Sequence, residues 1–205
     1  MTEKYYSQYP NYPTEIIVNK YLNKDPNIEK GIYIDIGAGH PIKINNTYYY
    51  YTKGWNGLLV EPYKAYHNAI KELRPKDIFE PIIITDYNGT AEMCGLTTVG
   101  TEAGDRFKAD PAYKSEIYFA QCMTIDTLIQ KYPQFSQPDY LSMDIEANEE
   151  KALSKCNFEI FKPQVICIEF LVGNIDYHKP LERYLLPYYE FKEDSCGNAF
   201  YVRRK

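Results

Sequence analysis

The chain has 205 residues and a net charge of −5, with 23 basic and 28 acidic side chains. This length suits one α/β domain, and the acidic balance argues against a nucleic-acid partner, which needs a basic face. No apolar run is long enough for a membrane span. Five cysteines without a CxxC pair predict unpaired thiols in a reducing, cytoplasmic setting.

The first expected elements are an arm and a helix. Residues 1–13 hold two prolines and four tyrosines, which favours an arm that lies along the body. Thr14 is a suitable cap for a helix that continues to Leu22. Pro26 and Gly31 then mark the end of the helix and the approach to the first strand.

The stretch GIYIDIGAG, residues 31–39, organises the rest of the chain. Its β-branched and aromatic residues predict a buried strand that closes in Asp35. Gly37, Ala38 and Gly39 predict a tight turn that carries little side chain, so a ligand can approach the backbone closely. This pattern is typical of a nucleotide-like cofactor site at the carboxyl end of a parallel strand.

A second acid fits the same interpretation. The run from Gly57 to Glu61 predicts a buried strand, and Glu61 follows the glycine turn by about 20 residues, as does an acid that binds ribose hydroxyls in doubly wound folds. Ile42 stands where a dinucleotide fingerprint has its third glycine. This difference argues against a nicotinamide cofactor and favours S-adenosylmethionine (AdoMet).

The elements around this pair follow from capping and turn signals. Asn45 or Asn46 is a suitable cap for a helix over 47–53, and Pro62 is suited to begin the next helix, which Pro75 ends. A third strand is expected over 78–85, a turn over 86–89 and an antiparallel strand over 90–96. Residues 97–115 are expected to form a long loop, either a lid or a plain surface loop.

The second half alternates strands and helices and ends in a hairpin. This order predicts a mostly parallel sheet with one reversed strand. The expected strands are 117–123, 139–145, 164–170, 188–194 and 199–203, and the expected helices are 125–132, 149–155 and 181–185.

Acids that close three strands are the first candidate site residues, because ligands bind outside the carboxyl ends of parallel strands. We expect Asp35 to orient the turn or meet the amino group of a methionine moiety. Glu61 is suited to bind the ribose diol. Asp86 is a further candidate, near the adenine, although a simple turn residue is the preferred interpretation there.

The third strand-end acid begins a second group. If the backbone stays extended, Asp144 and Glu146 face the same way. They are then suited to share a proton, to bind a divalent ion with Glu169, or to divide into cofactor holder and general base. Alternatively, Glu146 caps the following helix and Glu169 is structural. His40 is suited to proton transfer or to a neutral hydrogen-bonding role.

Several motifs resemble those of the FkbM-type AdoMet-dependent methyltransferases. Ser7-Gln8 is similar to an early element of the family, and YIDIGAGHPIKINNTYYYYTKGWNGLLVEP, residues 33–62, is similar to its cofactor half, including Asn46-Thr47. TIDTL and DYLSMDIEANE resemble its second half. The family pattern there is close to D-x-E-G-x-E, but Ala147 replaces the glycine, and alanine resists positive φ.

This resemblance implies a seven-stranded, Rossmann-like class I methyltransferase fold with an antiparallel C-terminal hairpin. It implies methyl transfer to an oxygen, often on a sugar, polysaccharide or natural product, and places Asn46 and Thr47 with the cofactor. We expect one domain, with an N-terminal arm and helix over 1–30 and a catalytic core over 31–205. Glu146 or His40 is the expected base, and Asp144 positions the cofactor or a metal.

Two other functions remain open from the sequence. One is a non-catalytic module that binds AdoMet or a nucleotide and partners a glycan-assembly enzyme. The other is a nicotinamide-dependent sugar enzyme, against which both Ile42 and the lack of a Tyr-x-x-x-Lys pair in a suitable helix argue. The sequence predicts neither the acceptor hydroxyl nor the oligomeric state.

Overall fold

The structure is a computed structural model that describes residues 14–100, 102–109, 117–172, 175–176 and 178–205. The expected arm over 1–13, with Ser7-Gln8, lies outside these residues. Within them, no helix has the length and apolar character needed to cross a membrane. All five cysteines are free thiols, which confirms the expectation of unpaired cysteines.

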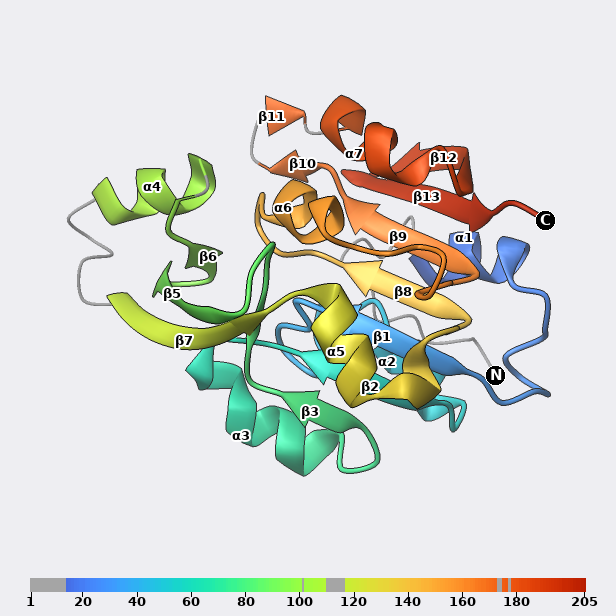
Figure 1. Ribbon diagram of the computed structural model, residues 1–205. Coiled ribbons are helices and arrows are strands. Elements are labelled where there is room, and N and C mark those ends of the chain that lie inside the picture. The colour runs from blue at the N-terminus through green and yellow to red at the C-terminus, as the bar shows by residue number, and fades with distance from the viewer. Residues whose placement is uncertain (1–13, 101, 110–116, 173–174, 177) are drawn as a thin grey trace.

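A seven-stranded sheet forms the centre of the molecule (Figure 1). Its strand order is β12-β13-β9-β8-β1-β2-β3, and β13 is the one reversed strand, antiparallel to both of its neighbours, β12 and β9. The predicted fold class is therefore confirmed, with a mostly parallel sheet and an antiparallel C-terminal hairpin. The strands are β1 (Ile32–Ile36), β2 (Asn56–Val60), β3 (Ile78–Glu80), β8 (Tyr140–Met143), β9 (Val165–Glu169), β12 (Tyr189–Ser195) and β13 (Asn198–Arg203).

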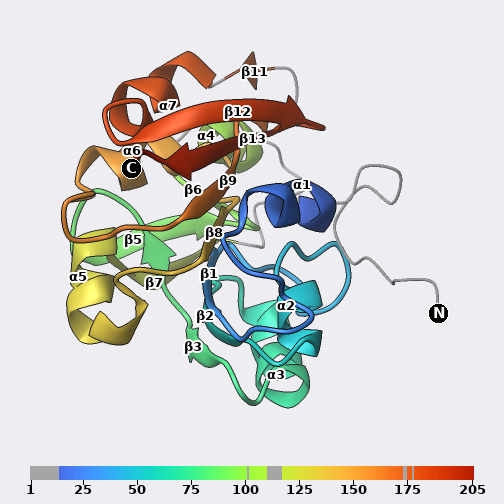
Figure 2. The ribbon, with the colours of Figure 1, turned by 90° about the vertical axis from the view of Figure 1, so that its right-hand side faces the viewer.

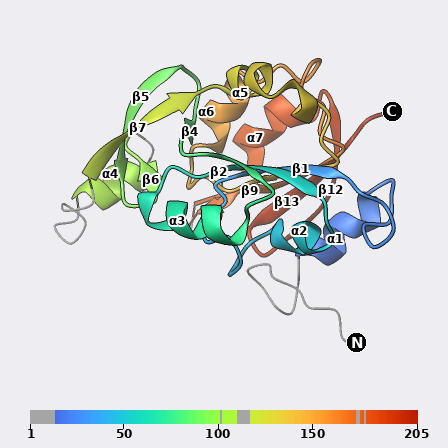
Figure 3. The same ribbon diagram turned by 90° about the horizontal axis from the view of Figure 1, so that it is seen from below.

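Helices cover both faces of this sheet (Figures 2 and 3). One face packs against α1 (Thr14–Tyr21), α2 (Tyr48–Thr52) and α3 (Lys64–Leu73). The other packs against α5 (Ile125–Lys131), α6 (Glu149–Ser154) and α7 (His178–Leu185). Alternation along β1 explains the two cores, because Tyr33 joins the first cluster and Ile34 the second.

The direction of strand addition reverses at β1. The sheet adds β2 and β3 on one side of β1, and β8 and β9 on the other. In open α/β sheets, ligands bind in the crevice that forms outside the carboxyl ends of the strands at such a switch point. Gly37 and Asp144 each directly follow one of the two central strands, so the topology places the glycine turn and the second acidic group at this crevice.

A second, four-stranded sheet was not predicted. Its order is β4-β7-β5-β6, formed by β4 (Ile83–Ile84), β5 (Gly89–Cys94), β6 (Thr97–Thr98) and β7 (Ile117–Met123). It lies beside the central sheet together with α4 (Glu102–Ala109) (Figure 1). The prediction of one long loop over 97–115 is wrong for its described part, which contains β6 and α4.

Prolines account for two other differences. The predicted third strand over 78–85 is two strands, since Pro81 separates β3 in the central sheet from β4 in the second sheet. The predicted helix start at Pro62 is also wrong. Tyr63 is the N-cap of α3, with extended backbone, and the helix begins at Lys64.

Short elements complete the chain. A 3₁₀ helix over Pro133–Phe135 follows α5. The two-stranded pair β10 (Leu171–Val172) and β11 (Ile175–Asp176) connects β9 to α7.

Candidate active site

The glycine turn joins the ends of three central strands. The backbone N–H groups of Gly37 and Ala38 donate to the carbonyl oxygen of Val60, at 2.9 and 3.1 Å. Gly37 has a φ of +83°, and a Cβ added there would lie 1.7 Å from the carbonyl oxygen of Asp144. Only glycine permits this close approach of β1 and β8. Packing against β8 and the hydrogen bonds to β2 therefore fix the conformation of the turn.

Glu61 binds the same turn from the end of β2. Its Oε2 accepts a hydrogen bond from the Gly39 N–H at 2.7 Å, and its Oε1 accepts one from the Tyr63 N–H at 2.7 Å. Burial raises the pKa of Glu61 to about 7, although both N–H groups favour the carboxylate. Each carboxylate oxygen retains a lone pair for a further donor, such as a ligand hydroxyl.

Asp35 lies behind the turn and does not line the cavity described below. Its Oδ2 accepts hydrogen bonds from Thr47 Oγ1 at 2.7 Å and Asn45 Nδ2 at 3.3 Å. Burial raises the pKa of Asp35 to about 6, while these two donors and Arg74 act to lower it. The geometry supports the first of its two expected roles, orientation of the turn.

Three other predicted cofactor residues, Asn46, Thr47 and Asp86, are also outside the cavity lining. Asn46 donates from Nδ2 to Ser142 Oγ at 3.3 Å. The Asp86 carboxylate accepts a hydrogen bond from the Thr85 hydroxyl at 3.2 Å. Neither residue, nor Thr47, is among those that line the cavity.

A cavity of about 420 Å³ opens between the glycine turn and the second sheet. This volume lies within the range of about 300–1,000 Å³ that is common for small-molecule sites. Both sheets contribute to it. Its lining is formed by residues 36–40, Lys43, Ile44, residues 60–62, Tyr66, residues 82–84, Met93, Leu96, Thr98, residues 144–146 and Asn148.

The backbone after β8 turns sharply. Glu146 and Ala147 have φ values of +57° and +69°, so the extended conformation assumed for Asp144 to Glu146 is wrong. Asp144 and Glu146 nevertheless both line the cavity. Ala147 adopts the positive φ that the family's glycine would adopt without strain. Burial, and then the charge of Asp144, raises the pKa of Glu146.

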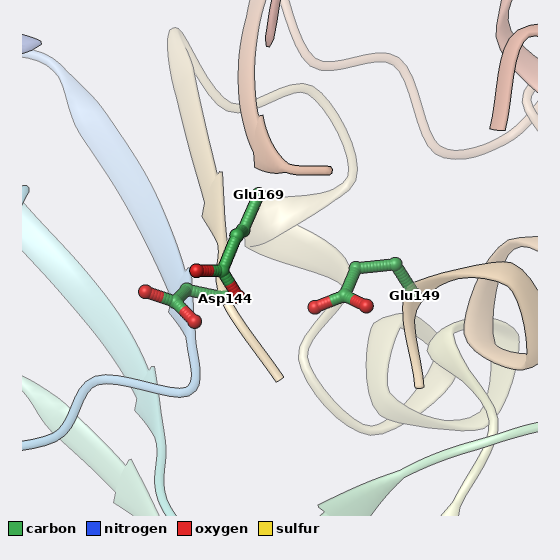
Figure 4. Close-up of side chains that lie close together, drawn as sticks. All are labelled: Asp144, Glu149 and Glu169. Carbon is green, nitrogen blue, oxygen red and sulfur yellow. The ribbon is translucent and has the colours of Figure 1, made fainter. Parts of the chain in front are cut away.

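Three carboxyl groups gather beside this turn (Figure 4). Asp144, Glu149 and Glu169 each offer an oxygen, and these oxygens all lie within 4.8 Å of one another. Glu149, rather than the expected Glu146, is therefore the third member of the group. Burial raises the pKa of all three, and to about 8 for Glu149. The charge of Asp144 further raises the pKa of Glu169, so the group retains protons near neutral pH.

His40 lines the cavity, but its Nδ1 accepts hydrogen bonds from the N–H groups of Ile42 and Lys43, each at 3.1 Å. In the neutral ring, the proton must then reside on Nε2. That nitrogen can donate a hydrogen bond to a ligand but has no lone pair with which to accept a proton. This geometry favours the hydrogen-bonding role of His40 over the role of base.

Sequence reasoning missed one well-connected residue, Arg74, because it was interpreted only as the end of a helix before Pro75. No local signal identifies it, since all hydrogen-bond partners of its side chain except Asp77 come from distant segments. Glu149 did have a signal, because the acids of the D-x-E-G-x-E pattern include it. Asn148, which donates to the Ile84 carbonyl oxygen at 2.7 Å and links α6 to β4, had no such signal.

Comparisons with known proteins indicate the family of the chain. The family model for the methyltransferase FkbM domain matches residues 35–197. Among solved structures, the chain is similar to a TehB-like SAM-dependent methyltransferase from Corynebacterium glutamicum, with 12% identity, a TM-score of 0.45, and coverage of 85% of this chain and 80% of that one. That likeness is too distant to bear on function. A search of curated proteins finds no match.

Proposed function

Because the chain belongs to the family of FkbM-domain methyltransferases, we propose that it transfers a methyl group from AdoMet to a hydroxyl group of a sugar, glycan or small metabolite. Residues 31–205 form the catalytic core in this proposal, and residues 1–30 an arm and helix. A cytoplasmic enzyme that works beside glycan-assembly enzymes fits the free thiols.

The observation that carries the proposal is the pairing of Glu61 with the glycine turn at the cavity wall. Glu61 is only 4% exposed, yet it lines the cavity and keeps lone pairs for the two ribose hydroxyls. Beside it, a Cβ added to Gly39 would have no atom within 4 Å. A nucleoside can therefore approach the backbone there without meeting a side chain.

The charge of the cavity also suits this cofactor. Glu61, Asp144 and Glu146 line it, together with the cation Lys43. Bound AdoMet supplies a methyl group activated by a sulfonium and also carries an ammonium group. Carboxylates that are costly to bury alone are stabilised by such positive charges.

Glu146 is the base in this proposal. Its carboxylate accepts the hydroxyl proton as the acceptor oxygen bonds to the methyl carbon and the sulfur–carbon bond breaks. A raised pKa makes the carboxylate a stronger proton acceptor than an exposed glutamate. The sharp backbone turn at Glu146 and Ala147 keeps Glu146 beside the cavity. Alignment of the reactants supplies the larger part of the acceleration.

Aromatic rings support a sugar as the acceptor. Tyr66 lines the cavity, and its ring packs edge-on against the rings of His40 and Tyr63, with centroids 6.1 and 5.5 Å apart. Tyr63 in turn lies near Tyr118 of β7. Such rings present apolar faces with polar tips, which suits the mixed surface of a sugar.

Two variants test the assigned roles. Glu61→Ala removes the acceptor of the ribose hydroxyls, so AdoMet affinity should fall by about 10- to 100-fold, as for lost hydrogen bonds to a charged group. Glu146→Gln keeps the shape but not the base, so turnover should fall by about 100-fold or more with little change in AdoMet affinity. Isothermal titration calorimetry and mass spectrometry with a panel of hydroxyl acceptors measure both.

Glu159→Ala is the matched control, because Glu159 is an exposed glutamate outside the cavity lining. It should bind AdoMet and turn over as the wild type does. Wild-type turnover by Glu146→Gln would contradict the assignment of the base. AdoMet binding without turnover across the whole panel would instead favour the non-catalytic module that partners a glycan-assembly enzyme.

A further inference from the structure

Arg74, directly after α3, is an unusually well-bonded buried cation. Its side chain has no exposed surface, and neither does that of Asp77, its ion-pair partner at 2.7 Å. Burying a charge costs several kcal/mol unless it is paired and hydrogen-bonded. Of the N–H groups of the Arg74 guanidinium, only that of Nε donates to Asp77, which leaves the four N–H groups of the two Nη atoms to be satisfied elsewhere.

Those four N–H groups bind the segment that follows the glycine turn, together with β1. Nη1 donates to the Pro41 carbonyl oxygen at 3.0 Å and to Asn45 Oδ1 at 3.3 Å. Nη2 donates to Tyr33 Oη at 2.7 Å and to Thr47 Oγ1 at 3.1 Å. One side chain therefore connects α3, the central strand β1 and both ends of the segment over 41–47.

Two of these partners, Thr47 and Asn45, also form hydrogen bonds with residues of the candidate site. The Thr47 hydroxyl accepts from Arg74 and donates to Asp35 Oδ2 at 2.7 Å. Asn45 accepts from Arg74 with its oxygen, while its Nδ2 donates to the Ala38 carbonyl oxygen at 2.9 Å. The guanidinium is thus linked through a single intermediate side chain to both the strand-end acid and the glycine turn.

The segment that Arg74 holds is strained. Ile44, which is 67% exposed and lines the cavity, has a φ of +50°. For a β-branched residue this backbone conformation is an outlier that persists only where the surroundings impose it. Arg74 binds Asn45, its direct neighbour, and Pro41 on the other side, so it provides that restraint.

We propose that Arg74 is a positioning residue of the cofactor site, which acts through Thr47 and Asn45 to hold Asp35 and the cavity wall over residues 38–45 in their ligand-binding arrangement. The part of this inference that concerns AdoMet rests on the proposed function. The part that concerns Asp35 and the wall does not.

Thr47→Val tests the hydrogen-bonded link from Arg74 through Thr47 to Asp35 without removing the buried charge of Arg74. It deletes the hydroxyl between Arg74 and Asp35 and nearly keeps the side-chain volume. Since the lost donor favoured the carboxylate, the pKa of Asp35, measured by carbon NMR on ligand-free protein, should rise above the wild-type value. AdoMet affinity should fall by about tenfold, which corresponds to the loss of one ordinary hydrogen bond. Thr47→Ser keeps the hydroxyl, so its Asp35 pKa and its AdoMet affinity should both lie close to the wild-type values.

Arg74→Lys tests whether the hydrogen bonds of the guanidinium hold the segment over residues 38–45. Lysine keeps the charge for Asp77 but has only three donors and no planar fork. In the folded variant, backbone amides over 38–45 should exchange with deuterium at least about ten times faster than in the wild type, because local opening becomes cheaper by about 1.4 kcal/mol.

The outcomes separate the two proposals. Unchanged Asp35 titration in Thr47→Val, or unchanged exchange over 38–45 in folded Arg74→Lys, would overturn the positioning role whatever the ligand. A wild-type protein that does not bind AdoMet would contradict the proposed function alone, since both ligand-free measurements still decide the role of Arg74.

Discussion

Ala147 is the residue at which this chain departs from the family pattern, and the structure shows the consequence. Ala147 has a φ of +69°, a conformation that glycine adopts without strain. An L-residue in this region is strained by about 1–2 kcal/mol relative to the right-handed one. The strain lies next to Glu146, the proposed base, where the backbone turn directs the carboxylate toward the cavity.

Ala147→Gly should therefore stabilise the protein by about 1 kcal/mol, because relief of strain exceeds the entropy that glycine loses on folding. Urea unfolding measures the change. Ala152→Gly is the matched control, since Ala152 lies in helix α6 and is fully buried. The same exchange should destabilise there by about 1 kcal/mol or more. Loss of stability at both positions would contradict the strain assigned to Ala147.

Glu149 makes stability depend on pH. Burial raises its pKa from 4.5 to about 8, so the folded state holds this proton more tightly than the unfolded state does. The free energy of unfolding should fall as the pH rises from about 4.5 to 8, by at most about 1.4 kcal/mol per pH unit from this group. In Glu149→Gln the side chain has no carboxyl group to titrate, and its amide oxygen can still accept a hydrogen bond from the Ile145 N–H.

Urea unfolding at several pH values checks this expectation. The stability of Glu149→Gln relative to the wild type should increase steadily between pH 5 and 8, since only in the wild type does the unfolded chain release a proton that the folded chain keeps. Parallel curves for the two proteins would show that Glu149 does not titrate in this window.

Site residues could be predicted from the sequence where they belong to a short motif. Gly37, Gly39 and Glu61 lie in short patterns, and the structure brings them together at one cavity. The roles of Asp35, Asn46, Thr47, Asp86 and Asp144 toward a ligand stay predictions. Arg74 was missed because its function depends on partners at positions 33, 41, 45, 47 and 77, which no local pattern connects.

At the scale of elements, the glycine turn contains two glycines with different tasks. Gly37 has Asp144 backbone atoms where a side chain would lie, whereas Gly39 has open space there. Both have positive φ. The first is needed for packing of β1 against β8, and the second leaves room for a ligand.

Gly37→Ala should destabilise the protein by about 3–5 kcal/mol, because its Cβ cannot coexist with the Asp144 carbonyl. Gly39→Ala should cost only about 1–2 kcal/mol of backbone strain, yet reduce AdoMet affinity by at least about tenfold, since the methyl occupies the approach to the turn. Thermal unfolding and calorimetry separate the two effects. Full AdoMet affinity in Gly39→Ala would place the ligand elsewhere.

Elements with strong periodicity were predicted well. Strand β1 and the helices α1 and α5 differ from the prediction by at most one residue at either end. The side chain of Thr124 caps α5 by accepting a hydrogen bond from the Thr127 N–H. The errors arose where a proline left two assignments open, as at Pro62 and Pro81, or where pairing partners are distant. Strand β5 is antiparallel as expected, but it pairs with β6 and β7 rather than with the preceding strand.

At the scale of the whole molecule, the cavity exists because two sheets meet. The central sheet supplies the turn and the acids, and the second sheet supplies Met93, Leu96 and Thr98 as the opposite wall. The alternation of strands and helices predicted the first sheet. The second sheet was missed because two of its strands have only two residues each. In addition, β5 pairs with β7 across 23 residues (94 to 117) to 33 residues (89 to 122), which is not visible in a local pattern.

The most direct test of the account is isothermal titration of the folded wild-type protein with AdoMet and with its demethylated product. The account predicts saturable heat for both ligands, with one ligand bound per chain, and a loss of about 10- to 100-fold in affinity for Glu61→Ala. Absence of heat with both ligands, in protein whose circular dichroism shows the α/β fold, would contradict the central claim that the glycine turn and Glu61 form a site for a sulfonium nucleoside.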